Sequence, residues 1–272
     1  KRLTNRGTGL IAVLVLYSLP IIGIESATTY IDIFIAVFVT AALHSALLWE
    51  HSSRKTWLLL TGIFSGLAVG AKLTAFWLLL PFWGLILWRL YHLRKLSWMN
   101  LAAVVAPVIL LWSPWLVRDG FWTGNPLFPN LNSIFQSPEW FDRNFFIFQP
   151  TRNTLRSIVL FPWLGVTQSH AYYHEAPGAV LAGLPLLCLP WMYYQRKKYV
   201  TLFLTASMAM ALLFSFGANA RYLMPLFPLL SVLAALNIVI FAKKLYSWKK
   251  RWAFGFVLLC LVYVFSTRLA FN

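Results

Sequence analysis

Acidic residues are scarce in this chain. Only 7 of its 272 residues are Asp or Glu, and charged residues of both signs make up 11% of the total. Hydrophobic residues account for 60%, which is more apolar surface than a soluble core of this length can bury, and the mean hydropathy of +0.70 agrees. The shortage of charge excludes an ordinary soluble domain and predicts that lipid surrounds most of the protein.

Cysteine and phosphate-binding loops are also lacking. The two cysteines, Cys188 and Cys260, fall within apolar segments and show no metal-ligand spacing. Neither a disulfide framework nor a cysteine metal site is therefore expected. There is no Walker-type or dinucleotide-binding glycine loop, which argues against ATP-driven transport by this chain alone.

Apolar runs recur along nearly the whole chain. A bilayer core roughly 30 Å thick needs about 20 apolar residues for each helical crossing. The runs predict an all-α, polytopic transmembrane protein with about nine crossings, forming a single transmembrane domain over residues 1–272. Residues 117–177 form one large outer loop, which we expect to contain short amphipathic helices at the membrane surface. The predicted crossings are 8–24, 31–49, 57–71, 74–90, 99–116, 178–194, 200–216, 223–242 and 252–268.

The net charge of +16 is distributed unevenly between alternate connections. One side contains 16 of the 23 basic residues and one acid, a net of +15, whereas the other contains seven basic residues and six acids, a net of +1. Because Lys and Arg in short loops set orientation, we expect the basic side and the N-terminus in the cytoplasm and the 117–177 loop outside. Membrane lipid is the expected partner. No soluble basic face exists to bind nucleic acid, so we expect none.

A helical hairpin with a glycine-lined face is predicted within 57–90. At about 1.5 Å per residue this segment is too long for one crossing, so we predict two short helices that meet at the outer face with Lys72 at their turn. Gly62, Gly66 and Gly70 recur at intervals of four. In lipid such a row of small residues lets the backbone of a second helix approach closely.

Charged side chains at the outer ends of the crossings are the candidates for chemistry, because charges near a membrane are costly unless solvated or paired. We expect Glu25, Asp32, Lys72 and Arg221 to share an outward-facing cavity. A carboxylate can deprotonate a hydroxyl or hold a divalent ion, and Lys and Arg can neutralise a phosphate. Spacing alone equally allows a simple interfacial ion pair of Asp32 with Lys72, with Arg221 extended to the headgroups.

The outer loop adds further candidates. His170 and His174 have the i, i+4 spacing of a metal-binding helical face, although the Pro and Gly that follow favour a solvated loop end. The amide of Asn125 could bind a sugar or pyrophosphate, yet Gly-Asn-Pro at 124–126 is also a turn signature. Arg118 precedes this turn.

Four motifs, in this order and spacing, resemble those of GT-C membrane glycosyltransferases. Residues 29–36 (TYIDIFIA) and 66–74 (GLAVGAKLT) resemble the "YxD" and "GLxxGxK" signatures. The segment from 115 to 129, with WLVR and TGNPLFP, is similar to the start of the large outer loop in bacterial members, and 221–228 (RYLMPLFP) resembles the late "RYxxPxxP" motif. Within that group the chain resembles protein O-mannosyltransferase-like and aminoarabinose-transferase-like enzymes of glycosyltransferase family 39.

The resemblance implies transfer of a sugar from a polyprenyl-phosphate donor to an acceptor at the outer face of the bacterial inner membrane. Asp32 would be the second acid of the catalytic site, which arranges the acceptor or a divalent metal ion. Lys72, Arg221 and Tyr222 would bind the donor phosphate. The sugar, the acceptor and any metal dependence are not indicated by the sequence.

One part of the family pattern is missing. The principal catalytic acid of these enzymes lies in the first outer loop, and no segment here matches that region. Either the acid precedes Lys1 in the native polypeptide, so that this chain lacks the N-terminal part, or the catalytic base has been lost; Glu25 is a substitute outside the expected context. The rival functions are a non-catalytic scaffold or subunit of a membrane complex, and a transporter or flippase, although the charges gather at one face rather than at mid-membrane.

Overall fold

The computed structural model describes residues 6–128, 131–137 and 224–248, together with residues 255, 259 and 262. This part of the chain is helical and contains no strand. The chain divides into two compact units, which we describe separately. The first unit comprises Lys1–Ala36 and Arg152–Asn272, and the second comprises Val37–Thr151.

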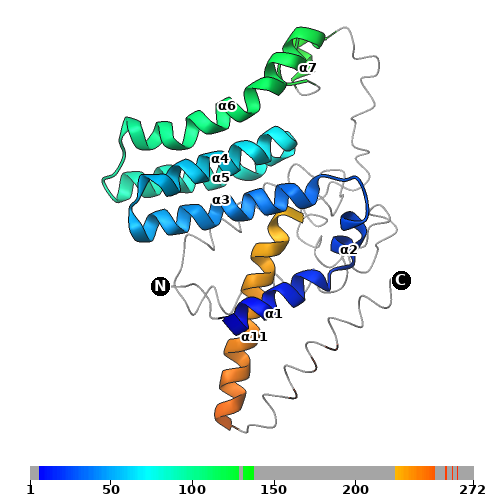
Figure 1. The fold of residues 1–272 in the computed structure, drawn as a ribbon, viewed down its shortest axis with the longest axis vertical. Coiled ribbons are helices and arrows are strands. Elements are labelled where there is room, and N and C mark those ends of the chain that lie inside the picture. The colour runs from blue at the N-terminus through cyan, green and yellow to red at the C-terminus, as the bar shows by residue number, and fades with distance from the viewer. Residues whose placement is uncertain are drawn as a thin grey trace. The chain divides into compact units, whose positions relative to one another are not determined.

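The first unit contains α1 (Arg6–Tyr17), α2 (Pro20–Ser26) and α11 (Phe227–Trp248), and α1 packs against α11 (Figure 1). The predicted crossing at 8–24 is broken between α1 and α2. Pro20 causes the break, because its ring fixes φ and it has no N–H to donate to a preceding helical turn. Leu19 before it is accordingly extended, with φ −68° and ψ 120°.

The second unit contains most of α3 (Asp32–Ser52), followed by α4 (Lys55–Ala71), α5 (Thr74–His92), α6 (Trp98–Thr123) and the short α7 (Asn132–Phe135). The helices α4 and α5 confirm the hairpin predicted at 57–71 and 74–90. Helix α6 extends seven residues beyond the predicted end at 116. Its apolar stretch does end there, but the backbone remains helical until Gly124 adopts a left-handed conformation with φ 70°.

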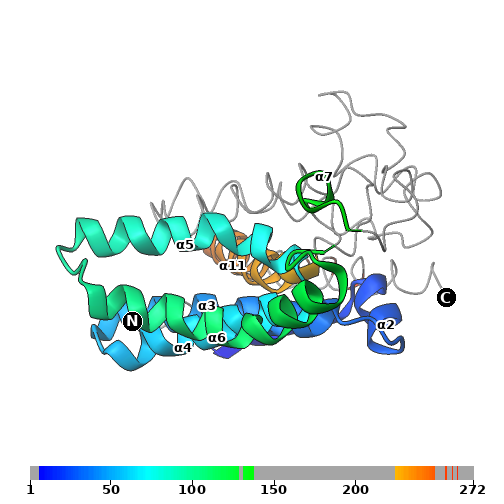
Figure 2. The same cartoon turned by 90° about the horizontal axis from the view of Figure 1, so that it is seen from above.

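The glycine row of α4 packs against α6, as predicted. A methyl group added at Gly62 would lie 2.5 Å from the carbonyl oxygen of Val104, and one at Gly66 would lie 2.8 Å from that of Pro107. At Gly70 the corresponding oxygen, on Leu111, is 3.0 Å away. Because both sequences advance in the same direction along this contact, α4 and α6 are parallel, and Figures 1 and 2 both show them side by side.

Within the described ranges, three helices are long and apolar enough to cross a membrane, namely α3, α5 and α6. Only 11% of the apolar window of α6 is buried within the protein. Such a surface is stable only in hydrocarbon, so the protein is an integral membrane protein. With 26 residues, α6 is about 39 Å long at about 1.5 Å per residue, which exceeds a hydrocarbon core of roughly 30 Å. The predicted number of nine crossings extends over residues outside the described ranges and stays a prediction.

The two ends of the second unit differ in charge. At one end, called the basic end, Arg89 of α5 pairs with Glu50 of α3, and Lys95 donates a hydrogen bond to the hydroxyl of Ser53. Lys55 lies there too, 4.0 Å from the sulfur of Met99. The opposite end, called the pocket end, is formed by the α4–α5 turn and the C-terminal turns of α6. This separation agrees with the predicted two-sided distribution of basic residues.

Candidate functional site

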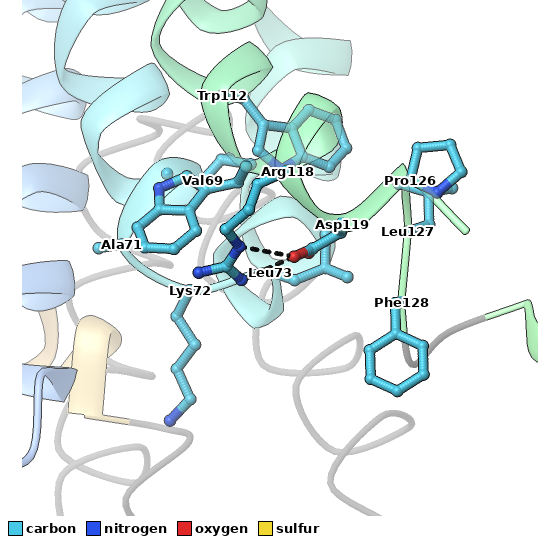
Figure 3. Close-up of a pocket in the computed structure, with 12 residues that line it drawn as sticks. Val69, Ala71, Lys72, Leu73, Trp112, Arg118, Asp119, Pro126, Leu127 and Phe128 are labelled. Atoms are coloured by element: carbon cyan, nitrogen blue, oxygen red, sulfur yellow. Dashed lines mark hydrogen bonds and ion pairs between the residues drawn. The ribbon is translucent and has the colours of Figure 1, made fainter. Parts of the chain in front are cut away.

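A pocket of about 240 Å³ lies at the pocket end of the second unit (Figure 3). Residues 69–73 line it from the α4–α5 turn, and Trp112, Trp115, Arg118 and Asp119 line it from α6. Residues 126–128, just beyond α6, complete the wall. The close, parallel packing of α4 on α6 brings these segments together, since the pocket-lining Gly70 lies against the backbone of Leu111, the residue before the pocket-lining Trp112.

Lys72 lies at the α4–α5 turn, as predicted. Its backbone is extended, with φ −160° and ψ 130°, and its N–H donates to the carbonyl of Ala68 at 3.2 Å. Its own carbonyl accepts from the N–H of Ala75 at 3.0 Å in the first turn of α5. The ammonium group points away from Arg118 and Asp119 (Figure 3), as expected for a cation that shares a pocket with a guanidinium. The turn is therefore held by backbone hydrogen bonds on both sides of Lys72.

Arg118 and Asp119 form an ion pair in the pocket. The Nε and Nη2 atoms of Arg118 both donate to Oδ1 of Asp119, at 2.9 and 2.6 Å. The guanidinium carbon lies 4.2 Å from the ring centroid of Trp115 and 5.7 Å from that of Trp122. The side chains are 43% and 19% exposed, so the pair itself stabilises the fold little. The tryptophans instead hold the guanidinium in place through cation–π contact.

The turn interpretation of Asn125 is confirmed. Its Oδ1 accepts from the N–H of Leu127 at 2.9 Å, and its carbonyl accepts from the N–H of Phe128 at 3.0 Å. Thr123 reinforces the turn, because its hydroxyl accepts from the Asn125 N–H at 3.2 Å. Asn125 is fully buried and is not one of the pocket-lining residues. Its part in the site is to turn the chain so that residues 126–128 reach the pocket.

The two candidate acids of the first unit are both buried. Glu25 in α2 is 1% exposed, and Asp32, the first residue of α3, is 2% exposed. A carboxylate in the first turn of a helix is stabilised by the N–H groups and the positive end of the helix dipole, which suits Asp32 to this position. Two buried carboxylates only seven residues apart are unusual, since burial of a charge is costly without compensating interactions.

Several predicted site residues lie outside the described ranges, namely Arg221, Tyr222, His170 and His174. Asp32 and Lys72 belong to different units. The cavity predicted to unite Glu25, Asp32, Lys72 and Arg221 thus stays a prediction. Within the described ranges there is no group of three or more His, Cys, Asp or Glu side chains that could hold a metal ion.

Sequence reasoning missed Asp119 and the aromatic wall formed by Trp112. It placed Arg118 in a loop, whereas Arg118 lies in the penultimate turn of α6. A signal was present in the sequence: residues 115, 118, 119 and 122 have the i, i+3, i+4, i+7 spacing of one helical face. That face became apparent only once α6 was known to continue to Thr123.

The helices define an integral membrane protein, and a pocket lined by charged and aromatic side chains lies at one end of its second unit. Residues 1–119 match the model of the dolichyl-phosphate-mannose-protein mannosyltransferase family. No curated protein and no solved structure matches the chain. The match confirms the resemblance to GT-C glycosyltransferases over a region that includes Asp32, Lys72, Arg118 and Asp119. The late motif at 221–228 lies beyond it.

Proposed function

We propose that this protein transfers a sugar from a polyprenyl-phosphate donor to an acceptor at the outer face of a membrane. The observation that carries the proposal is the position of Lys72. It lies in the segment that matches the mannosyltransferase family, and it lines a pocket at the end of the bundle opposite the basic end. The name of that family describes transfer of mannose from dolichyl phosphate to protein.

Cleavage of a sugar–phosphate bond leaves negative charge on the departing lipid phosphate. The Lys72 ammonium can follow and neutralise this charge, because its flexible stem is anchored on a turn with fixed backbone bonds. Arg118, which is paired with Asp119, lines the same pocket. Exposed apolar side chains of α6, such as Val117 at 70% and Phe121 at 85%, provide a hydrocarbon-like surface for the polyprenyl chain beside these cations.

The acceptor hydroxyl needs a base or a charge that orients it. In this proposal Asp32, the first residue of α3, arranges the acceptor. A principal base would act with it, and Glu25 is the other buried carboxylate of this segment. Two carboxylates offer the hard oxygen ligands of a divalent ion, but the described residues include no third His, Cys, Asp or Glu ligand beside them.

The proposal includes an orientation in the membrane. The basic end faces the cytoplasm and the pocket end the outside, so that transfer takes place at the outer face, in bacteria that of the inner membrane; the separation of basic residues supports this orientation. Labelling of single cysteines introduced at the α4–α5 turn and at the α5–α6 turn in intact cells tests this orientation. A membrane-impermeant thiol reagent should modify the former and leave the latter unmodified; the reverse pattern would refute the assignment.

Transfer is tested with the full chain in lipid nanodiscs, supplied with polyprenyl phosphate carrying radiolabelled mannose. The matched pair is Lys72→Gln, in the α4–α5 turn, and Lys95→Gln, in the α5–α6 turn at the basic end. We expect Lys72→Gln to lower donor consumption roughly 100-fold or more, the scale of losing one charge-stabilising group, and Lys95→Gln to leave it unchanged. If the unmodified protein neither binds nor consumes the donor lipid, the proposal fails and a non-catalytic scaffold becomes the better explanation.

A further inference from the structure

We infer that Asp119 binds a hydroxyl group of the donor sugar, so that the pocket beside Trp112 is the sugar subsite and Arg118 is a positioning residue. This inference rests on the proposed function, because it assumes that the donor is a phosphate-linked sugar. It assigns a substrate contact to an acid that is not one of the predicted site residues. Four observations support it.

The first observation is the unequal use of the two carboxylate oxygens. Both hydrogen bonds from Arg118 end on Oδ1 of Asp119. No other hydrogen bond to this carboxylate is found among the described residues, so Oδ2 retains its full acceptor capacity. The side chain is 19% exposed and lines the pocket, so Oδ2 is available to a ligand. A carboxylate oxygen can accept two hydrogen bonds, which suits it to sugar hydroxyls.

The second observation is that Arg118 is fixed and balances the charge of Asp119. Its guanidinium is held over Trp115 at 4.2 Å, so it cannot readily leave the carboxylate. A carboxylate paired in this way is suited to accept hydrogen bonds and poorly suited to remove a proton. Asp119 is thus better placed to bind a hydroxyl than to act as the missing general base.

The third observation concerns the shape and composition of the pocket. Its volume of about 240 Å³ is below the roughly 300–1,000 Å³ of sites for drug-sized ligands, and it suits one small polar group such as a single sugar ring. Trp112 offers an apolar wall for the carbon–hydrogen face of such a ring. That indole is held in turn by Phe76, at a centroid distance of 5.5 Å, and Phe76 packs edge-on against Trp83 at 5.6 Å. The wall is therefore rigid.

The fourth observation is the division of charge within the pocket. The ammonium of Lys72 points away from the Arg118–Asp119 pair (Figure 3). A cation and a hydrogen-bond acceptor that point in different directions match the two parts of one donor, a phosphate and a sugar. A phosphate alone would make no use of the free carboxylate oxygen of Asp119.

The experiment compares two lipids on the same protein in nanodiscs: polyprenyl phosphate, and the same lipid carrying mannose. The readout is the ratio of their dissociation constants. The unmodified protein should prefer the mannosyl lipid. Asp119→Ala should reduce this preference roughly 10- to 100-fold, the cost of losing a hydrogen bond to a charged group, with the affinity for the sugar-free lipid unchanged. Asp119→Asn, which keeps one acceptor oxygen, should reduce the preference for the mannosyl lipid by a smaller factor.

The controls separate this inference from the proposed function. Lys72→Gln should weaken the binding of both lipids by the same factor and leave the ratio of their dissociation constants unchanged. Glu50→Gln, which breaks the Arg–carboxylate pair at the basic end, should change neither affinity. An unaltered ratio in Asp119→Ala, or an unmodified protein that binds both lipids equally, overturns the sugar subsite while the proposed function stands. Failure of the unmodified protein to bind either lipid overturns both.

Discussion

The described residues of the second unit include an arginine–carboxylate pair at each end, and the two pairs differ in what they connect. Arg89 and Glu50 are 39 residues apart and join α5 to α3, with side chains 27% and 15% exposed. Arg118 and Asp119 are adjacent in sequence, lie on one helix, and join no two elements. The first pair contributes to the tertiary structure. The second pair is unnecessary for packing, which suggests that it serves a ligand.

The aromatic surroundings extend the comparison. Two tryptophans lie over or near the Arg118 guanidinium. The Glu50–Arg89 pair is instead a contact between two helices. Ordering an exposed arginine over exposed indoles costs side-chain entropy without strengthening the core. Such an arrangement is expected where a charged group must be preorganised.

The largest effect should come from removing the helix contact on which both ends depend. In Gly66→Leu the new side chain would clash with the Pro107 carbonyl, so α4 and α6 must separate, and we expect loss of roughly 3 kcal/mol or more of stability. Gly84→Leu is the control, since nothing lies within 4 Å of its added methyl group. Thermal unfolding in detergent measures both. Equal melting temperatures for the two variants would show that the close contact does not exist.

The next largest effect, on the rate of sugar transfer, should distinguish Asp32 and Glu50, the acids near opposite ends of α3. Asp32→Asn should lower sugar transfer by roughly 100-fold or more, the scale of losing a group that acts on the acceptor hydroxyl, whereas Glu50→Gln should leave the rate unchanged. Initial rates with a saturating donor lipid provide the measurement. Full activity in Asp32→Asn would remove Asp32 from the site and leave the pocket residues of the second unit in place.

Measurements of stability directly test the difference between the Arg89–Glu50 and Arg118–Asp119 pairs. Glu50→Ala should cost about 1–3 kcal/mol, because it leaves the half-buried Arg89 without its carboxylate and releases α5 from α3. Asp119→Ala should cost less than about 1 kcal/mol, because its partner is on the same helix and well exposed. Reversible unfolding of both variants under one condition decides the point. The opposite ranking would make the Arg118–Asp119 pair a structural one.

The smallest effect is expected from Arg118→Lys. The charge is retained, but the two hydrogen bonds to Oδ1 and the planar contact with Trp115 are lost. The preference for the mannosyl lipid should fall several-fold, less than in Asp119→Ala, with thermal stability unaltered. A preference equal to that of the unmodified protein would show that Asp119 needs no positioning by Arg118.

Much of the local structure could be predicted. Hydropathy located α3 to α5 within a few residues, and the four-residue glycine spacing predicted a close helix contact. The first helix was the exception, because Pro20 divides an otherwise continuous apolar run. The end of α6 was missed for a related reason: hydropathy reports where lipid ends, and the helix continues beyond it into the polar interface.

For the candidate site, the sequence placed Lys72 correctly at the turn between two helices. It left two roles open for Asn125, a ligand for a sugar or pyrophosphate and a residue of a turn. The sequence could not show that Asp119 shares a pocket with Lys72, because the two residues are 47 positions apart and only the parallel packing of α4 on α6 brings them together. Residue spacing along one helix predicts neighbours on that helix. It carries no information about which helix lies opposite.

The amino-acid sequence by itself determined that this is an integral membrane protein, that its helices form where apolar runs occur, and that most basic residues lie in alternate connections. Each of these properties depends on composition and local spacing. Only the tertiary structure decided which residues line the pocket. Glycines without side chains allow two backbones to approach to within van der Waals contact, and this contact places the Lys72 turn beside the Arg118–Asp119 pair. Lipid drives single helices to form, but only steric fit between them brings charges from distant positions into one site.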